Sequence, residues 1–522
     1  MKKLTILTFL FISVSSLLIA QTKKPNIIFV LVDDMGFSDL GCYGGEVKTP
    51  NIDRLADQGI KMRSFYNNAR CCPTRASVLT GKYPHAVGMG HMVSLPTDTI
   101  QPGSYQGYLD HKYPTVAEEL KKAGYNTYMT GKWHVGERKE DWPLNRGFDR
   151  YYGLISGASS FWEITPQEKF KRIFALDNKE IELPEKGFYA TDAYTDSAIS
   201  FLTTHHTKNK KNPFFLYLAY TAPHYPLHAY EEDIIKYEQI YSQGWDKIRE
   251  TRFEKMKSLG FADQRYQLTP KTSELEAWDI QTPTDKETYI RKMAVHAAML
   301  DRLDQNIGRL IQYLKRKGEW ENTMLVFLSD NGASAETVNT KKLHDPSTKI
   351  GEKGSYAAIG ENWANTSNTP FKLYKHNIHE GGIATPMIIH WPAAIKPNIG
   401  YADGVGHVID LMPTALEMAG IRSHHTDGMS LSWLWNGKKQ PDRTVFWEHE
   451  NNLSLRKGNW KLLKESNEAE WSLFDMDKDP TEMNNLAKSY PEITKSLIEE
   501  YKTWSVNVGV KEFKGKVMQN GK

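Results

Sequence analysis

Two continuous apolar runs constrain the fold of this chain more than any other feature. The first, NIIFVLV, spans residues 26–32, and the second, TMLVFLS, spans residues 323–329. Runs that are rich in β-branched residues and lack alternating polar positions are typical of strands buried on both faces. Such strands occur mainly in parallel sheets that helices cover on both sides. We therefore expect both runs to be central strands of an α/β sandwich.

Helical patterns alternate with a further strand pattern between these two runs. Residues 115–124, 192–206 and 288–317 have the spacing of helices, and the apolar segment PFFLYLAY at 213–220 is a third buried strand. This alternation predicts an α/β fold in which a large, mainly parallel or mixed central sheet is sandwiched by helices. The charged stretch from about residue 230 to 285 is expected to be a helical insertion over one end of the sheet.

The pattern changes near Arg443, where short runs of alternating apolar and polar residues begin. An amphipathic stretch at residues 493–504 follows them. Together they predict a smaller antiparallel sheet with one packed helix. We therefore divide the chain into a main catalytic domain, residues 21–440, and a C-terminal subdomain, residues 441–522.

Residues 1–20 have the layout of a secretory signal peptide, with two lysines, an apolar stretch from Leu4 to Ile19, and Ala20 at the cleavage position. An uncleaved membrane anchor is the alternative, but the run is short compared with the roughly 20 apolar residues of a spanning helix. We expect an exported protein, periplasmic or alternatively secreted, without a stable membrane anchor. The net charge of +3 gives no indication of nucleic-acid binding.

The chain has three cysteines, Cys42, Cys71 and Cys72. An exported chain with so few thiols is not a disulfide scaffold, and adjacent cysteines are poorly placed to bridge each other. We expect Cys42 to be a buried apolar side chain. A disulfide from Cys42 to either of the other cysteines is the open alternative.

Polar side chains follow three of the predicted strands at the point where each strand ends. They are Asp33 and Asp34 after the run at 26–32, His224 after the run at 213–220, and Asp330 and Asn331 after the run at 323–329. Because sites in such sheets form beyond the carboxyl ends of the strands, we expect these side chains to converge. The oxygens of the two aspartate-containing pairs suit Ca²⁺ or Mg²⁺ and disfavour zinc or copper, although strand-end acids also form turns.

Five side chains provide a local positive field in a chain of almost balanced charge. They are Arg75, Lys132, His134, His224 and Lys375. Each of them alone fits a surface cation or a hydrogen-bonded histidine. Together they would attract an anionic ester.

Several short motifs occur in the order that is found in one enzyme family. The segment from Cys71 to Gly81, CCPTRASVLTG, matches the family's nucleophile signature, and a second signature is matched between Gly124 and His134. The other motifs are VDDMG, APHYP, SDNGA, LYKHNIHEGG and HWP. On these motifs the chain resembles the type I sulfatases of the alkaline-phosphatase superfamily, close to bacterial arylsulfatases, from about Lys24 to its end.

The resemblance implies that a formylglycine-generating maturation enzyme oxidises the signature cysteine to 3-oxoalanine (Cα-formylglycine), an aldehyde. Cys71 has proline two positions on, at Pro73, and arginine four positions on, at Arg75. Cys71 is therefore the expected site of modification, and Cys72 is its variable neighbour. One hydroxyl of the hydrated aldehyde would attack sulfur, and deprotonation of the other would expel sulfate.

The resemblance also implies a set of metal ligands. They are Asp33, Asp34, Asp330, Asn331 and an oxygen of the modified Cys71, which together would hold one Ca²⁺, with Mg²⁺ less favoured. Asp330 is in addition the candidate base that activates the nucleophile.

The cationic residues receive the remaining roles by the same resemblance. Arg75 would hold the formylglycine, and His134 would accept the proton whose removal releases sulfate. Lys132, His224 and Lys375 would bind sulfate oxygens. Either His224 or Lys375 would protonate the departing oxygen.

These roles imply a sulfuric ester hydrolase, and export implies sulfated carbohydrates as substrates, expected to be oligosaccharides from algal polysaccharides or glycosaminoglycans. The alternative enzyme is a phosphonate or phosphodiester hydrolase of the same superfamily. The alternative of another class is a non-catalytic protein that binds sulfated glycans. Trp133, Trp162, Tyr225 and His228 are candidate walls of the substrate pocket, with core packing as an equal explanation.

Overall fold

The computed structural model describes residues 23–94, 102–164, 171–271, 275–338, 343–397, 399–422 and 424–513. The predicted signal peptide and its membrane-anchor alternative lie outside these residues. Within them, no helix combines the length and the apolar character that are needed to cross a membrane.

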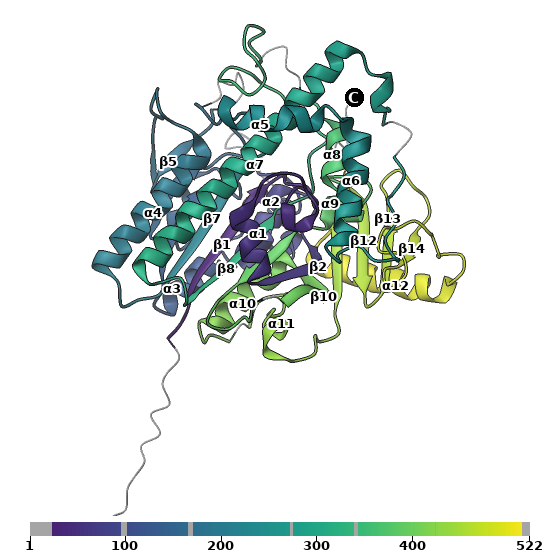
Figure 1. Cartoon of the computed structure of the whole chain (residues 1–522). Helices are drawn as coiled ribbons and strands as arrows, with labels where there is room; N and C mark the ends of the chain where they lie inside the picture. The colour runs from purple at the N-terminus through teal and green to yellow at the C-terminus, as the bar shows by residue number, and fades with distance from the viewer. Residues whose placement is uncertain are drawn as a thin grey trace, which may run out of the picture.

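A mixed sheet of ten strands forms the centre of the molecule (Figure 1). The two apolar runs of the sequence are neighbours in it, because β1 (Asn26–Asp33) and β8 (Thr323–Ser329) pair in parallel and are buried throughout. The third apolar run, β7 (Phe214–Pro223), pairs in parallel with the other edge of β1. In sheet order the strands are β10 (Ile399–His407), β2 (Ile60–Tyr66), β9 (Met387–His390), β8, β1, β7, β3 (Asn126–Gly131), β4 (Arg150–Leu154), β5 (Phe174–Leu176) and β6 (Lys179–Glu180).

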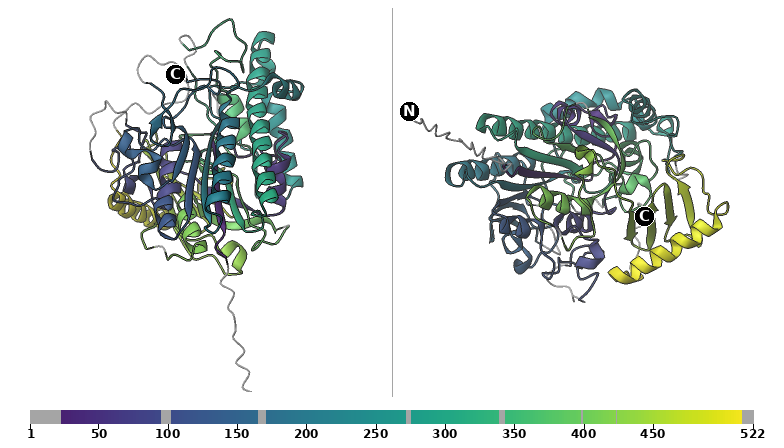
Figure 2. Two further views of the ribbon diagram at one scale, coloured as in Figure 1. Left: turned by 90° about the vertical axis from the view of Figure 1, so that its left-hand side faces the viewer. Right: turned by 90° about the horizontal axis from the view of Figure 1, so that it is seen from below.

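Helices cover both faces of this sheet (Figure 2). Alternate residues of β1 show the two layers, because Ile28 and Val30 pack into one core cluster while Ile27 and Phe29 pack into the other. The first cluster includes residues of α1 (Pro50–Asp57), α4 (Ala190–Lys208) and α7 (Pro283–Lys317), and the second includes residues of α2 (Cys71–Thr80), α3 (Val116–Lys122) and α10 (Leu411–Met418). The predicted α/β sandwich is therefore confirmed.

The long helix α7 begins at Pro283 rather than near Thr288. Thr282 caps its first turn, since the hydroxyl oxygen accepts a hydrogen bond from the amide of Asp285 at 3.2 Å. The helix ends at Gly318, whose φ of 68° is favourable for glycine.

The charged insertion is helical, as predicted. It contains α5 (Glu231–Tyr241), which packs against α7, and α6 (Gly244–Ser258), which packs against α8 (Glu361–Ser367).

The C-terminal part forms the predicted antiparallel sheet with one helix. Its strands are β11 (Thr444–His449), β12 (Asn452–Lys457), β13 (Trp460–Lys464) and β14 (Ser472–Asp475), and the helix is α12 (Pro491–Val508).

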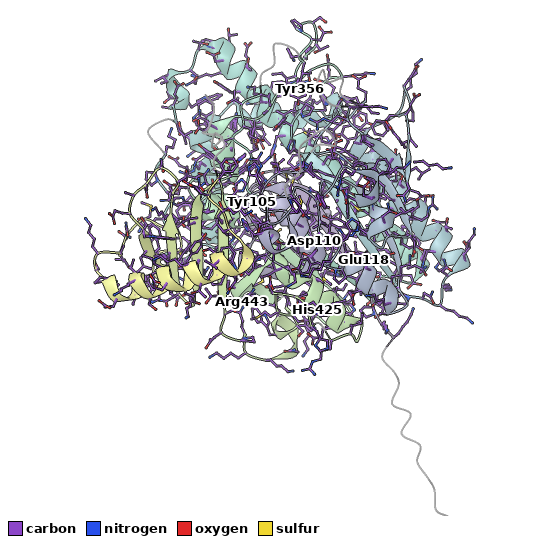
Figure 3. The ribbon with its side chains drawn as sticks, turned by 180° about the vertical axis from the view of Figure 1, so that it is seen from behind. Tyr105, Asp110, Glu118, Tyr356, His425 and Arg443 are labelled. Carbon is purple, nitrogen blue, oxygen red and sulfur yellow. The ribbon has the colours of Figure 1, made fainter. Side chains whose placement is uncertain are left out.

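Side-chain contacts join this sheet to the main domain at several places, for example between Lys461 and Glu380. The indole nitrogen of Trp447 donates a hydrogen bond to the carbonyl of Asn67 at 2.7 Å. At the start of the sheet, Arg443, which Figure 3 labels, pairs with Asp410 of the main domain. The fold class is thus confirmed, whereas the boundary between residues 440 and 441 stays a prediction.

The three cysteines all lie within the described residues, and none of them forms a disulfide. Cys42 is buried in the core cluster that includes Val47 and Ile52. Its predicted apolar role is therefore confirmed, and the alternative disulfide is not formed.

Candidate active site

The polar residues that follow β1, β7 and β8 meet at the carboxyl edge of the sheet, as predicted. The amide nitrogen of Asp34 lies 3.3 Å from Oδ1 of Asp330, and Nδ2 of Asn331 donates to Oδ1 of Asp34 at 2.6 Å. Nε2 of His224 lies 3.5 Å from Oδ2 of Asp34. The cluster joins residues as far as 297 positions apart in the sequence. They meet because their three strands are adjacent and parallel.

The cysteine segment forms the helix α2. Cys71 is its first residue, Arg70 before it is extended, and Gly81 ends the helix with a φ of 65°. All ten residues of α2 are buried, so the segment lacks the alternation of apolar and polar faces that would predict a helix. Residue 71 therefore lies in the first turn, where free amide groups give a partial positive charge.

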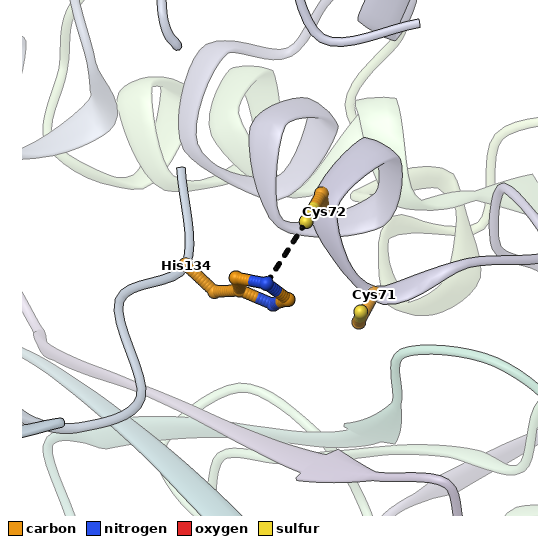
Figure 4. A group of neighbouring side chains, drawn as sticks. All are labelled: Cys71, Cys72 and His134. Atoms are coloured by element: carbon orange, nitrogen blue, oxygen red, sulfur yellow. Dashed lines mark hydrogen bonds between the residues drawn. The ribbon is translucent and has the colours of Figure 1, made fainter. Parts of the chain in front are cut away.

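His134 lies beside the two cysteines at the start of α2 (Figure 4). Its Nε2 is 3.3 Å from the sulfur of Cys72. In the unmodified chain, the pKa of Cys71 is held well below its usual range by a hydrogen bond from Cys72, with help from Lys132 and His134. Burial lowers the pKa of His134 to about 4, so the imidazole is neutral at pH 7 and able to accept a proton.

Arg75 joins the cysteine helix to the acidic cluster. Its Nε and Nη2 lie 3.1 Å and 2.7 Å from Oδ2 of Asp330, and its Nη1 donates to the carbonyl of Lys132 at 3.1 Å. Nη2 also lies 3.6 Å from Oδ1 of Asp33. Because Arg75 is completely buried, these contacts fix the position of α2 relative to the ends of β1 and β8.

Two lysines pair with the remaining acids. Nζ of Lys132 lies 2.7 Å from Oδ2 of Asp33, and Nζ of Lys375 lies 3.0 Å from Asp34. Both lysine side chains are buried. Burial would lower the pKa of Lys375, but Asp34 and the nearby Glu336 hold it well above its usual range, so the ammonium is charged.

The acidic cluster fits a hard divalent cation. Oδ1 of Asp33 and Oδ1 of Asn331 are buried and have no hydrogen-bond partner among the described residues. Burial and the neighbouring Asp33 raise the pKa of Asp330 well above its usual range, whereas nearby cations, led by Lys132, overcome burial and lower the pKa of Asp33 to about 2. A cation would bind the two orphaned oxygens and allow both carboxylates to be charged.

Sequence reasoning missed three ionisable residues beside this cluster. Oε2 of Glu336 lies 3.1 Å from Nζ of Lys375, and Oε1 lies 3.1 Å from Nε2 of His376. Arg70 lies 3.7 Å from the same carboxylate. Glu336 follows Asn331 in an irregular loop, where an acid has no distinctive pattern, but His376 and Arg70 directly flank Lys375 and Cys71 and could have been inferred as neighbours.

The candidate pocket walls separate into two groups. Trp133 is fully buried and donates to the carbonyl of Asp141, and Trp162 packs against Tyr189, so both have packing roles. His228 is also buried, with its two ring nitrogens bonded to backbone atoms. Tyr225 lines a small cavity together with Asp34 and remains a candidate wall.

Comparison with known proteins identifies the family. The family model described as Sulfatase matches residues 25–421, and the model described as N-sulphoglucosamine sulphohydrolase, C-terminal, matches residues 371–506. An uncharacterized sulfatase of Schizosaccharomyces pombe is 35% identical, with 94% of this chain and 95% of that protein covered. An arylsulfatase of Klebsiella aerogenes is 35% identical, with 77% of this chain and 88% of that protein covered.

A solved structure agrees with these matches. The crystal structure of Ps i-CgsB in complex with k-i-k-neocarrahexaose has a TM-score of 0.70 and 25% identity, and 94% of each chain is covered. The matching families and relatives are sulfatases, so the phosphodiester hydrolase and the non-catalytic binding protein lose their support. The chain therefore belongs to the sulfatase family, and it is an enzyme that hydrolyses sulfuric esters.

Proposed function

We propose that this sulfatase removes sulfate from sulfated carbohydrates, with Cys71 converted to formylglycine by a maturation enzyme and Ca²⁺ bound beside it. The observation that carries the proposal is the contact of Arg75, one turn after Cys71 on α2, with Asp330 at the end of β8. This contact brings the modifiable residue and the oxygen ligands to one buried place. Asp33, Asp34, Asp330 and Asn331 would hold the cation.

The bound cation would stabilise negative charge on a sulfate oxygen, and the hydrated aldehyde would provide the attacking hydroxyl. The chain itself would position the ester. Lys132 and Lys375 approach the acidic cluster from different elements, and their buried ammonium groups would bind sulfate oxygens.

Three side chains are suited to move protons. Neutral His134, next to residue 71, would accept the proton from the aldehyde hydrate and so release sulfate. The ring nitrogen Nδ1 of His224 lies 2.6 Å from the carbonyl of Tyr225 and donates to it, so Nε2 is the nitrogen directed at Asp34. Lys375 is charged, and either it or protonated His224 would donate to the departing oxygen.

A carbohydrate substrate is supported by two of the comparisons. The C-terminal family model is named for an enzyme of N-sulphoglucosamine, and the similar Ps i-CgsB was crystallised with an oligosaccharide. We further propose export to the periplasm or beyond it, on the basis of the N-terminal sequence.

A sulfate-release assay tests the proposal. Protein co-expressed with a maturation enzyme would be given sulfated oligosaccharides and a matched pair of aryl sulfate and aryl phosphate. We expect sulfate release from at least one oligosaccharide and faster turnover of the aryl sulfate, both abolished in Cys71→Ala. Activity on aryl sulfates with none on any glycan would refute the carbohydrate substrate.

A further inference from the structure

A cleft of about 250 Å³ opens directly beside the proposed sulfate site. Glu336, which contacts the ammonium of Lys375 at 3.1 Å, is one of its lining residues. The cleft also contains Lys292 on α7, His344 and Tyr356. Because it begins at a group that would hold the ester, the part of the substrate beyond the ester oxygen can lie in it.

Lys292 is an unusual cation for its position. It is half-buried, and it forms no ion pair with any of the described residues, although its Nζ lies 5.6 Å from the centre of the Tyr289 ring. Two arginines of the same helix do form such pairs: Arg291 with Glu231 and Glu238, and Arg302 with Asp192. Burial accordingly lowers the pKa of Lys292. A partly desolvated cation without a counter-charge is costly, and a ligand anion would relieve that cost.

The cleft is not made acidic by Glu336. Its carboxylate is already held by Lys375, His376 and Arg70, which overcome burial and keep its pKa well below the usual range. These contacts offset its charge at the inner end of the cleft. The charge of Lys292 is not offset in the same way by the described residues.

Two neutral groups in the cleft can donate hydrogen bonds to an anion. Nδ1 of His344 accepts from the amide of Tyr356 at 3.0 Å, so in the neutral ring the proton is on Nε2. The phenol of Tyr356 is a donor as well. Burial raises the pKa of Tyr356, and the charge of the nearby Arg172 opposes that rise. Arg172 forms no ion pair within the described ranges. Figure 3 labels Tyr356 near the top of the view from behind.

We propose that this cleft is a subsite for a second anionic group of the substrate, a second sulfate or a uronate carboxylate, bound by Lys292 with His344 and Tyr356. The inference rests on the proposed function, because it assumes that the sulfate ester is at Lys132 and Lys375. It narrows the substrate class to sulfated sugars with at least two negative charges. A sugar with a single sulfate would leave Lys292 without a counter-ion.

The test compares three sulfated disaccharides that share the same scissile ester. One has no other charge, one has a second sulfate, and one has a uronate carboxylate. We expect the wild type to prefer one of the doubly charged substrates by about tenfold in kcat/KM, as for one charge-assisted hydrogen bond. The preferred substrate identifies which anion the cleft binds.

Lys292→Met and Lys315→Met are the matched variants, because both remove one positive charge from α7 and Lys315 is exposed near the other end of the helix. We expect Lys292→Met to lose about tenfold in the ratio of kcat/KM between doubly and singly charged substrates, and Lys315→Met to keep the ratio. The ratio cancels any general loss of folded or modified enzyme.

A preference that is absent in the wild type, or unchanged in Lys292→Met, would overturn the inference. The proposed function would survive that result, since sulfate release from the singly charged substrate would still be seen. Absence of sulfate release from all three substrates, with aryl sulfate still cleaved, would instead refute the carbohydrate function.

Discussion

Replacing Glu336 with glutamine tests whether Lys375 is held in place for catalysis. The carboxylate contacts Nζ of Lys375 and Nε2 of His376 at 3.1 Å each, so the substitution keeps the shape of the side chain and removes its charge. A charge-assisted hydrogen bond contributes about 1.5–3 kcal/mol. Because Asp34 still contacts Lys375, we expect a loss of about 2 kcal/mol in transition-state stabilisation, roughly thirtyfold in kcat/KM.

The leaving group of the substrate separates two roles of Lys375 in this variant. If the ammonium protonates the departing oxygen, kcat should fall much more for a sugar sulfate than for nitrophenyl sulfate, whose leaving group needs little protonation. If it only binds sulfate oxygens, both substrates should lose activity equally. Steady-state kinetics of the two substrates measure the difference.

Glu254→Gln is the control, because Glu254 is exposed and its only ion pair among the described residues is with Lys257. The control should retain wild-type kinetics. Wild-type kinetics of Glu336→Gln on both substrates would refute the reasoning, since Lys375 would then not depend on its contact with Glu336.

Three other perturbations have defined outcomes. Removal of divalent cations by a chelator should abolish activity. It should also lower the free energy of unfolding by about 3 kcal/mol, compared with protein in Ca²⁺ at a hundred times its Kd. Recovery of activity with Mg²⁺ but not with Ca²⁺ would contradict the assignment of the ion. Burial lowers the pKa of His228 to about 4. Its contribution to stability is therefore complete above about pH 6.5 and is lost as the pH falls towards 4. The free energy of unfolding should decrease by up to about 3 kcal/mol over this range. Denaturant unfolding from pH 7.5 to 4.5 should show a smaller loss of stability in His228→Gln, and an identical pH dependence would refute the neutral buried imidazole. Cys72→Ala should retain sulfatase activity, and its complete inactivation would show that Cys72 is more than a neighbour of the modified residue.

The central part of the fold could be predicted because burial leaves a direct pattern in the sequence. A strand that is covered on both faces has no polar positions, and β1, β7 and β8 were recognisable for that reason. Sites form at the carboxyl ends of parallel strands, and this rule alone indicated that Asp34, His224 and Asp330 lie together. The inference succeeded because the three strands are parallel neighbours.

The helix α2 could not be predicted in the same way. All of its residues are buried, since it packs beneath the site and against the C-terminal part of the main domain, and a helix buried all round has no periodic polar face. The contact of Glu336 with Lys375 could not be predicted from the sequence either. It depends on the paths of two irregular loops, and neither residue lies at a fixed spacing from the other.

The packing of the aromatic residues also required the structure. Trp133 lies between two residues of the site, Lys132 and His134, but its indole points into the core and donates to the backbone of Asp141. Proximity in sequence to a site therefore did not decide which side chains face the substrate.

The central claim is that residue 71 is an aldehyde in the active enzyme. Mass spectrometry of the peptide that contains residues 71–75, taken from protein of measured sulfatase activity, tests it most directly. We predict formylglycine at position 71 and an intact thiol at Cys72, with the fraction of modified peptide proportional to specific activity. An unmodified Cys71 in fully active enzyme, or a formylglycine at position 72, would contradict the account.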